Sequence, residues 1–116
     1  GLIPGGLLAK ILDVENFISY GVSSYAEEDQ GKFNVYQPLP KDFGKGLIGD
    51  VLIVDDLAHT GKTFLHVKDK IIKQNRQRHF NIYTVAPYFK TGAAYKPDLW
   101  ITEIPEDTWL EFPWET

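Results

Sequence analysis

The chain contains no cysteine among its 116 residues. We therefore expect neither a disulfide framework nor a thiolate metal site. No apolar run approaches the roughly 20 residues of a transmembrane helix, and no signal peptide is visible. Cations are outnumbered by acids, 12 to 16, and the net charge of −4 is opposite to that of most nucleic-acid binders. These features favour a single cytoplasmic domain that acts on small molecules and binds no nucleic acid.

The most informative segment, residues 51–63, is an apolar run followed by two acids and a small polar turn. The run Val51–Val54 is apolar on both faces, which predicts a central parallel strand buried between helix layers. Asp55 and Asp56 follow at the carboxyl end, where open α/β sheets bind ligands. Residues 58–63 offer backbone N–H groups, two threonine hydroxyls and a helix N-terminus. Such a turn suits an anion of phosphate size.

A nucleotide-binding P-loop is the main alternative, because Gly61, Lys62 and Thr63 match the last three residues of that motif. The motif also requires a glycine five residues before Gly61. This chain has Asp56 there, and its carboxylate would repel the phosphates that the loop must hold. The spacing therefore excludes a P-loop.

The pattern acid-acid-x-x-x-Thr-Gly-x-Thr after an apolar strand resembles the phosphoribosyl pyrophosphate motif of the type I phosphoribosyltransferases. The resemblance implies that Asp55 and Asp56 contact the ribose hydroxyls and hold Mg²⁺, for which carboxylate oxygens are suitable ligands. A phosphate monoester requires N–H and O–H donors instead. The residues implied to bind it are Ala58, His59, Thr60, Gly61, Lys62 and Thr63.

A second stretch is similar to the oxopurine branch of this family. Lys90 lies 19 residues before Trp109, in a tail that covers residues 104–114. The resemblance implies that Lys90 donates a hydrogen bond to the purine 6-oxo group and that Trp109 lies along the base. Backbone carbonyls near Trp109 and Leu110 would accept hydrogen bonds from the edge that carries the 2-substituent.

Two further segments extend the resemblance to nearly the whole chain. Gly1–Ala9 is similar to the segment that follows the pyrophosphate loop, with Gly1 as the last residue of that loop. Residues 23–25 are similar to the entry of the loop that closes over the reacting centre. Its acidic run, residues 27–29, is expected to be a solvated turn. Because relatives have residues before Gly1, we expect residues 1–116 to form one phosphoribosyltransferase domain that lacks its N-terminal strand and helix.

His59 departs from the family pattern, which usually has an aspartate that assists proton transfer at purine N7. One interpretation is that the imidazole is an alternative base, because its reference pKa of about 6.5 is close to neutral pH. The other is that His59 merely faces solvent or phosphate. The sequence favours neither.

Apolar periodicity predicts the other elements: a helix at 4–12, strands at 17–24, 32–36, 80–85 and 99–102, and a helix from about Gly61. Trp100 is expected in the core. Alternating strands and helices predict the type I phosphoribosyltransferase fold, an α/β fold. It has a central, mostly parallel sheet flanked by helices, a flexible loop and a small C-terminal hood after Pro105. Residues 31–49, rich in glycine and proline, are expected to form a variable loop.

A basic cluster stands out from the acidic background, and it is most simply a solvated helix end. Cations late in a helix suit the macrodipole, and no aromatic residues interleave them as in single-strand nucleic-acid platforms. The cluster comprises Lys68, Lys70, Lys73, Arg76, Arg78 and His79.

The resemblance implies transfer of 5-phosphoribosyl from phosphoribosyl pyrophosphate to guanine, xanthine or hypoxanthine. In this hypothesis the catalytic residues are Asp55, Asp56 and His59, the cofactor is Mg²⁺, and the protein is a dimer or tetramer. A non-catalytic regulator of the same fold that binds phosphoribosyl pyrophosphate is the alternative. Lys90 and Trp109 favour the enzyme, because a sensor of the sugar phosphate would not need them.

Overall fold

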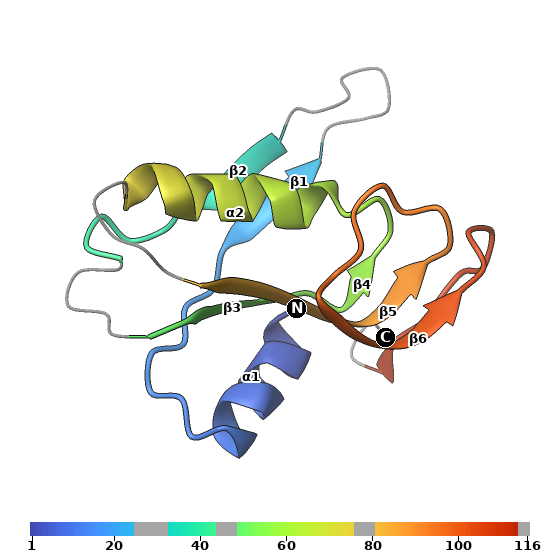
Figure 1. Cartoon of the computed structure of the whole chain (residues 1–116), viewed down its shortest axis with the longest axis horizontal. Coiled ribbons are helices and arrows are strands. Elements are labelled where there is room, and N and C mark those ends of the chain that lie inside the picture. Colours follow the sequence, from blue (N-terminus) through green and yellow to red (C-terminus); the bar gives the residue numbers. More distant parts are fainter. Residues whose placement is uncertain (25–32, 44–48, 76–80, 114–116) are drawn as a thin grey trace.

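Four parallel strands form the main sheet of the computed structural model (Figure 1). The sheet is organised around β5 (Ile82–Lys90), which is its longest strand. On one edge β5 pairs first with β3 (Val51–Val54) and then with β4 (Leu57–Ala58). On the other edge it pairs with β6 (Leu99–Ile104). The structure describes residues 1–24, 33–43, 49–75 and 81–113.

The two helices cover opposite faces of this sheet (Figure 1). The helix α1 (Leu2–Ile11) packs against β3 from one side, and α2 (Lys62–Gln74) packs against it from the other. A separate antiparallel hairpin of β1 (Gly21–Ser24) and β2 (Phe33–Gln37) lies on the α2 side, where β1 contacts the helix. No helix in the described ranges is long and apolar enough to cross a membrane.

The amphipathic pattern predicted for the second helix is confirmed. Its buried side chains are Phe64, Val67 and Ile71, spaced three and four residues apart on one face. Lys70 and Lys73 are exposed on the opposite side, as expected for a solvated surface. The remaining cations of the basic cluster, residues 76, 78 and 79, lie outside the described residues.

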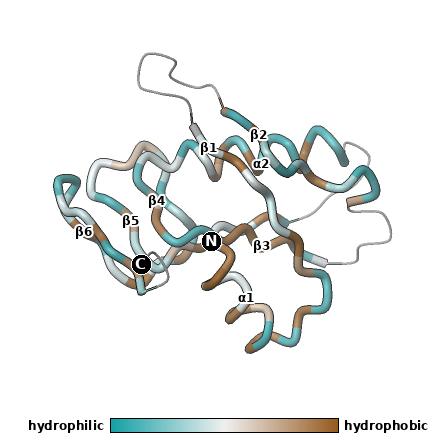
Figure 2. The backbone as a smooth tube through the Cα atoms, turned by 180° about the vertical axis from the view of Figure 1, so that it is seen from behind, coloured by the Kyte–Doolittle hydropathy of each residue, from teal (hydrophilic) through white to brown (hydrophobic). Residues whose placement is uncertain are grey.

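The buried core lies between α2 and the carboxyl-terminal half of the sheet. It is formed by Ala58, Phe64, Ala86 and Phe89, with partly buried residues of the segment after β5 packed against it. The helix α1 is different, because only Gly5 is buried there and most of its apolar side chains are exposed. Figure 2 shows this helix as a largely hydrophobic segment.

Two burial predictions were wrong. The strand Val51–Val54 was expected to be fully buried, but Leu52 is 40% exposed and its neighbours are only half-buried. Among the described strands, β3 pairs with β5 alone, so its other edge is open. Trp100 was expected in the core and is 41% exposed. It lies on β6 at the other edge of the sheet. Its ring packs edge-on against Phe89, with centroids 4.8 Å apart, and Lys96 Nζ lies 5.1 Å from the Trp100 ring centroid.

Several helices and strands begin or end at residues other than the predicted ones. The first helix begins at Leu2 rather than residue 4, the strand expected from residue 17 begins at Gly21, and the last strand continues to Ile104. The strand expected to end at residue 85 continues to Lys90, through Pro87, which reads in sequence as a strand breaker. The predicted starts at residues 32 and 80, the acidic run 27–29 and residue 25 of the loop entry lie outside the described residues. Ser23 and Ser24, the first two residues of that entry, are the last two residues of β1.

Candidate functional site

Asp55 and Asp56 form a two-residue interruption between β3 and β4. Both strands pair with the same edge of β5 in one unchanged register. In that register Asp56 lies opposite Pro87, which has no N–H to donate to the ladder. The backbone N–H of Asp55 still donates to the Val85 carbonyl at 3.0 Å. The pairing with β5 is thus interrupted at the two acids, which lie next to the buried core.

The two carboxyl groups are held close together and only partly solvated. The Asp55 side chain is 31% exposed, and its Oδ1 accepts a hydrogen bond from the Asp56 backbone N–H at 2.9 Å. Burial raises the pKa of the Asp55 carboxyl above its usual value. Partly buried carboxylates without a fixed cationic side chain attract a cation or hydroxyl donors.

Gly1 lies against this pair of acids, as the resemblance to a pyrophosphate-loop terminus implies. Its nitrogen is 3.5 Å from Asp55 Oδ1. A β-carbon at Gly1 would be 2.9 Å from the Asp55 Cα and would also collide with the Val54 carbonyl oxygen. This close approach of two backbones requires glycine.

The polar turn connects β4 to α2 and has the properties expected of an anion cradle. Ala58 is buried in the core, whereas His59 and Thr60 are exposed. Gly61 is the N-cap of α2 and has φ +83°, with no side-chain cap. Thr60 Oγ1 accepts a hydrogen bond from the Lys62 N–H at 3.2 Å. With no acid in the first turn of α2, the helix N-terminus remains favourable for an anion.

Lys90 lies at the end of β5, next in the sheet to the turn. Its side chain is only 8% exposed, and Nζ donates to the Glu106 carbonyl at 3.2 Å. The segment after β6 therefore folds over the lysine, as expected for the predicted hood. On this segment Trp109 is 86% exposed and Leu110 is half-buried. The exposed indole of Trp109 offers a flat apolar surface for a planar ligand.

No motif in the sequence indicated Tyr95, which contacts the turn from the connection between β5 and β6. Its N–H donates to the Thr60 carbonyl at 3.2 Å. A β-carbon at Gly61 would be 2.6 Å from the Tyr95 Cβ, so glycine is required by this contact as well as by its positive φ. The two segments are more than thirty residues apart in the chain, beyond the reach of any local motif.

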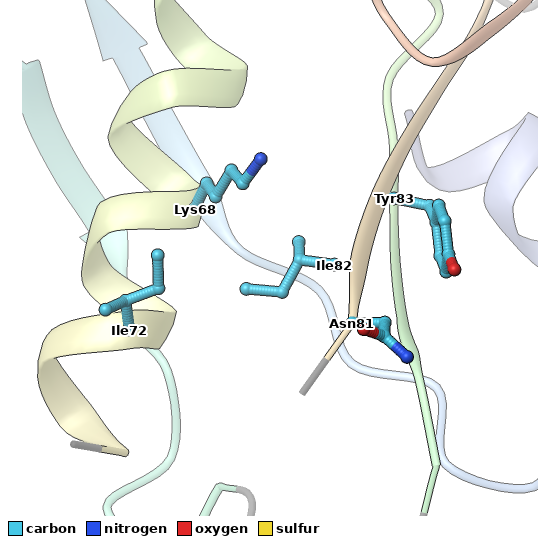
Figure 3. Close-up of a pocket in the computed structure, with 5 residues that line it drawn as sticks. All are labelled: Lys68, Ile72, Asn81, Ile82 and Tyr83. Carbon is cyan, nitrogen blue, oxygen red and sulfur yellow. The ribbon is translucent and has the colours of Figure 1, made fainter. Parts of the chain in front are cut away.

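An open pocket of about 300 Å³ lies at the opposite end of the sheet, between α2 and the start of β5 (Figure 3). Lys68 and Ile72 face Ile82 across it, while Tyr83 points to the other side of the strand. Asn81 completes the lining. Because the acids and Lys90 follow the carboxyl ends of the strands, this pocket is not part of the candidate site.

Comparison with known proteins agrees with this geometry. The chain is 34% identical over 115 residues to the xanthine-guanine phosphoribosyltransferase of Chromohalobacter salexigens. This match covers 99% of the chain but only 63% of the relative. No protein-family model matches the sequence.

Two solved structures have the same fold. A purine phosphoribosyltransferase from Pyrococcus horikoshii superposes with a TM-score of 0.75 at 26% identity. The xanthine-guanine-hypoxanthine phosphoribosyltransferase of Helicobacter pylori superposes with a TM-score of 0.78 at 23% identity. Each match covers 99% of this chain and 70% of the other.

The parallel sheet, with two acids after β3 and a polar turn after β4, and these two superpositions define a phosphoribosyltransferase fold. More specifically, the chain is similar over nearly its whole length to part of a xanthine-guanine phosphoribosyltransferase.

Proposed function

We propose that the protein is an oxopurine phosphoribosyltransferase. It would transfer the 5-phosphoribosyl group of phosphoribosyl pyrophosphate to N9 of guanine, xanthine or hypoxanthine and release pyrophosphate. One observation carries the proposal: the acids follow β3, the turn of residues 58–63 follows β4, and Lys90 is the last residue of β5, the strand with which both others pair. A sugar phosphate and a base would thus be held side by side.

In this proposal Asp55 and Asp56 bind the ribose hydroxyls, and the turn of residues 58–63 binds the 5′-phosphate. The two acids also suit Mg²⁺, which usually binds one or two carboxylates and completes its shell with water and substrate oxygens. The described residues contain no group of three or more side chains that would hold a metal alone, which is consistent with a site shared with substrate. Bound there, Mg²⁺ would offset the negative charge of pyrophosphate.

Lys90 explains the proposed choice of base. A lysine ammonium has three donors and no acceptor, so it matches a 6-oxo group and not the 6-amino group of adenine. One donor of Lys90 is already directed to the Glu106 carbonyl. That bond fixes the ammonium and leaves donors for the purine, while Trp109 would lie along the ring.

The proposed chemistry depends chiefly on positioning. The bond from C1′ to pyrophosphate loosens first and leaves an oxocarbenium-like centre, which N9 of the base attacks. Asp55, Asp56 and the turn hold the sugar in place for this step, and Lys90 orients the base. His59 is exposed, which fits both the role of a base at N7 and contact with phosphate or solvent.

The regulator remains the second candidate, because His59 stands where relatives usually have an acid. Nucleotide formation from guanine, xanthine, hypoxanthine and adenine, with phosphoribosyl pyrophosphate and Mg²⁺, separates the two in the full-length protein. The enzyme proposal expects turnover of oxopurines and not of adenine. Magnesium-dependent binding of phosphoribosyl pyrophosphate without turnover would favour the regulator.

From the resemblance we also propose that the protein is cytoplasmic and forms a homo-oligomer.

A further inference from the structure

Tyr95 is attached to the anion turn through its main chain. Its N–H donates to the Thr60 carbonyl at 3.2 Å, and its own carbonyl fills the space where Gly61 would carry a β-carbon. The ring of Tyr95 packs against Phe64 on the first turn of α2, with centroids 6.1 Å apart. Two residues of the turn, Thr60 and Gly61, and one residue of the helix that follows it are therefore in contact with Tyr95.

The hydrogen bond from Tyr95 to the Thr60 carbonyl fixes the orientation of the peptide between Thr60 and Gly61. In a trans peptide the C=O and the following N–H point in opposite directions, and the described residues contain no cis peptide. The peptide between Thr60 and Gly61 directs its carbonyl toward Tyr95, so the Gly61 N–H points away from Tyr95. Thr60 is exposed beside this N–H, whereas Gly61 itself is buried. Tyr95 thus sets the direction of one backbone donor.

The other end of Tyr95 is fixed in the core. Its hydroxyl lies 3.1 Å from Oγ1 of Thr84, a residue of β5 with no exposed surface. The backbone N–H of Thr84 donates to Asp98 Oδ2 at 2.8 Å, and the Asp98 N–H donates to Thr84 Oγ1 at 3.0 Å. Tyr95 is therefore held between a hydrogen-bonded pair in the sheet and the peptide of the turn.

We propose that Tyr95 is a positioning residue for phosphate binding, held by Thr84 and Asp98 so that the Gly61 N–H is directed at the 5′-phosphate before substrate arrives. The inference rests on the proposed function and adds to it a residue outside the motif. A preorganised donor costs no rearrangement when the anion binds, which is the general advantage of fixed dipoles in a site. Tyr95 acts through the turn and need not touch substrate.

The test is Tyr95→Phe, which removes the hydroxyl and keeps the ring. Ribose 5-phosphate is the probe, because it carries the phosphate without the pyrophosphate or base. We expect its Kd, and the KM for phosphoribosyl pyrophosphate, to rise about two- to tenfold, the range for one neutral hydrogen bond. Tyr95→Ala should have a larger effect. The KM for guanine should stay within about twofold in both variants, since Lys90 is untouched.

Tyr83→Phe is the matched control, because this tyrosine is next to Thr84 on β5 but points to the side of the strand away from α2 (Figure 3). It should leave the Kd unchanged. The amide NMR signal of Gly61 gives a second reading: ribose 5-phosphate should shift it in the wild type, and less in Tyr95→Phe at equal occupancy. Urea unfolding shows whether each variant is folded at the temperature of the assay.

An unchanged Kd in folded Tyr95→Phe and Tyr95→Ala would overturn the role of Tyr95. Equal increases in the KM for guanine and for phosphoribosyl pyrophosphate would do the same, because they indicate a general loss of structure. Wild-type binding of ribose 5-phosphate without turnover would refute the proposed enzyme and leave the Tyr95 comparison valid. No wild-type binding would refute both.

Discussion

Replacing Lys90 with methionine tests the proposed base site most directly. Methionine keeps most of the length and apolar volume of the side chain but has no N–H donor. Lys90 is 8% exposed and its Nζ donates to the Glu106 carbonyl at 3.2 Å. The substitution therefore removes one intramolecular hydrogen bond and, in the proposed complex, the donor to the purine 6-oxo group.

The two losses differ in size. A hydrogen bond from a charged donor contributes about 1.5–3 kcal/mol, which corresponds to roughly 10- to 150-fold in binding of the base. Folding should change less, by about 1 kcal/mol or under, because Glu106 is exposed and water can reach its carbonyl. The KM for guanine should therefore rise far more than the KM for phosphoribosyl pyrophosphate.

Steady-state kinetics with each substrate varied in turn measures both constants. Lys96→Met is the control, since Lys96 is a neighbouring lysine that lies over the rings of Phe89 and Trp100 and outside the site. It should leave both KM values near those of the wild type. Equal increases for guanine and phosphoribosyl pyrophosphate in Lys90→Met, or no increase for either, would refute the base-binding role of Lys90.

Three further substitutions test other parts of the structure. Gly61→Ala should lower the free energy of unfolding by about 2–5 kcal/mol, since it combines a left-handed backbone with a collision. Gly92→Ala also has a positive φ, of +90°, but its β-carbon would make only an ordinary contact with the Glu106 side chain at 3.4 Å, so it should cost only about 1–2 kcal/mol in the same urea titration. Equal losses in the two variants would contradict the collision. Burial lowers the pKa of His66, so the unfolded chain binds a proton first as pH falls below about 6.5 and stability should decrease there; His66→Gln should flatten this dependence, and an unchanged slope would contradict it. Burial raises the pKa of the Asp55 carboxyl, so the ionised carboxylate opposes folding once the pH is above this raised pKa. At pH 7, Asp55→Asn should therefore stabilise the free protein and weaken magnesium-dependent binding of phosphoribosyl pyrophosphate. A destabilised variant would contradict this account.

Local patterns in the sequence predicted much of the motif region. The strand Val51–Val54 has the predicted bounds, two acids follow it, and the next helix begins one residue after Gly61. These features depend on neighbouring residues, so a periodic pattern and a turn signal are sufficient to predict them. The short strand β4 was missed because two residues have no periodicity, and only pairing with β5 defines them.

Contacts between distant segments could not be predicted from spacing. The bond from Tyr95 to Thr60 and the bond from Lys90 to Glu106 each join segments that follow different strands. The exposure of Trp100 likewise depends on β6 lying at the edge of the sheet, which no property of residues 99–104 indicates. The motif resemblance identified the candidate residues, whereas their mutual placement required the fold.

In the proposed enzyme, the register of β5 would set the distance between the phosphate site and the base site. Consecutive residues of this strand pair with the two elements that end at the candidate site: Phe89 with Ala58, just before the anion turn, and Lys90 with Ile104, just before the hood. Neighbouring strands are about 4.8 Å apart, and a slip of one residue would turn every side chain to the other face. The separation between the 5′-phosphate and the 6-oxo group of a bound nucleotide would therefore be gauged by the backbone itself.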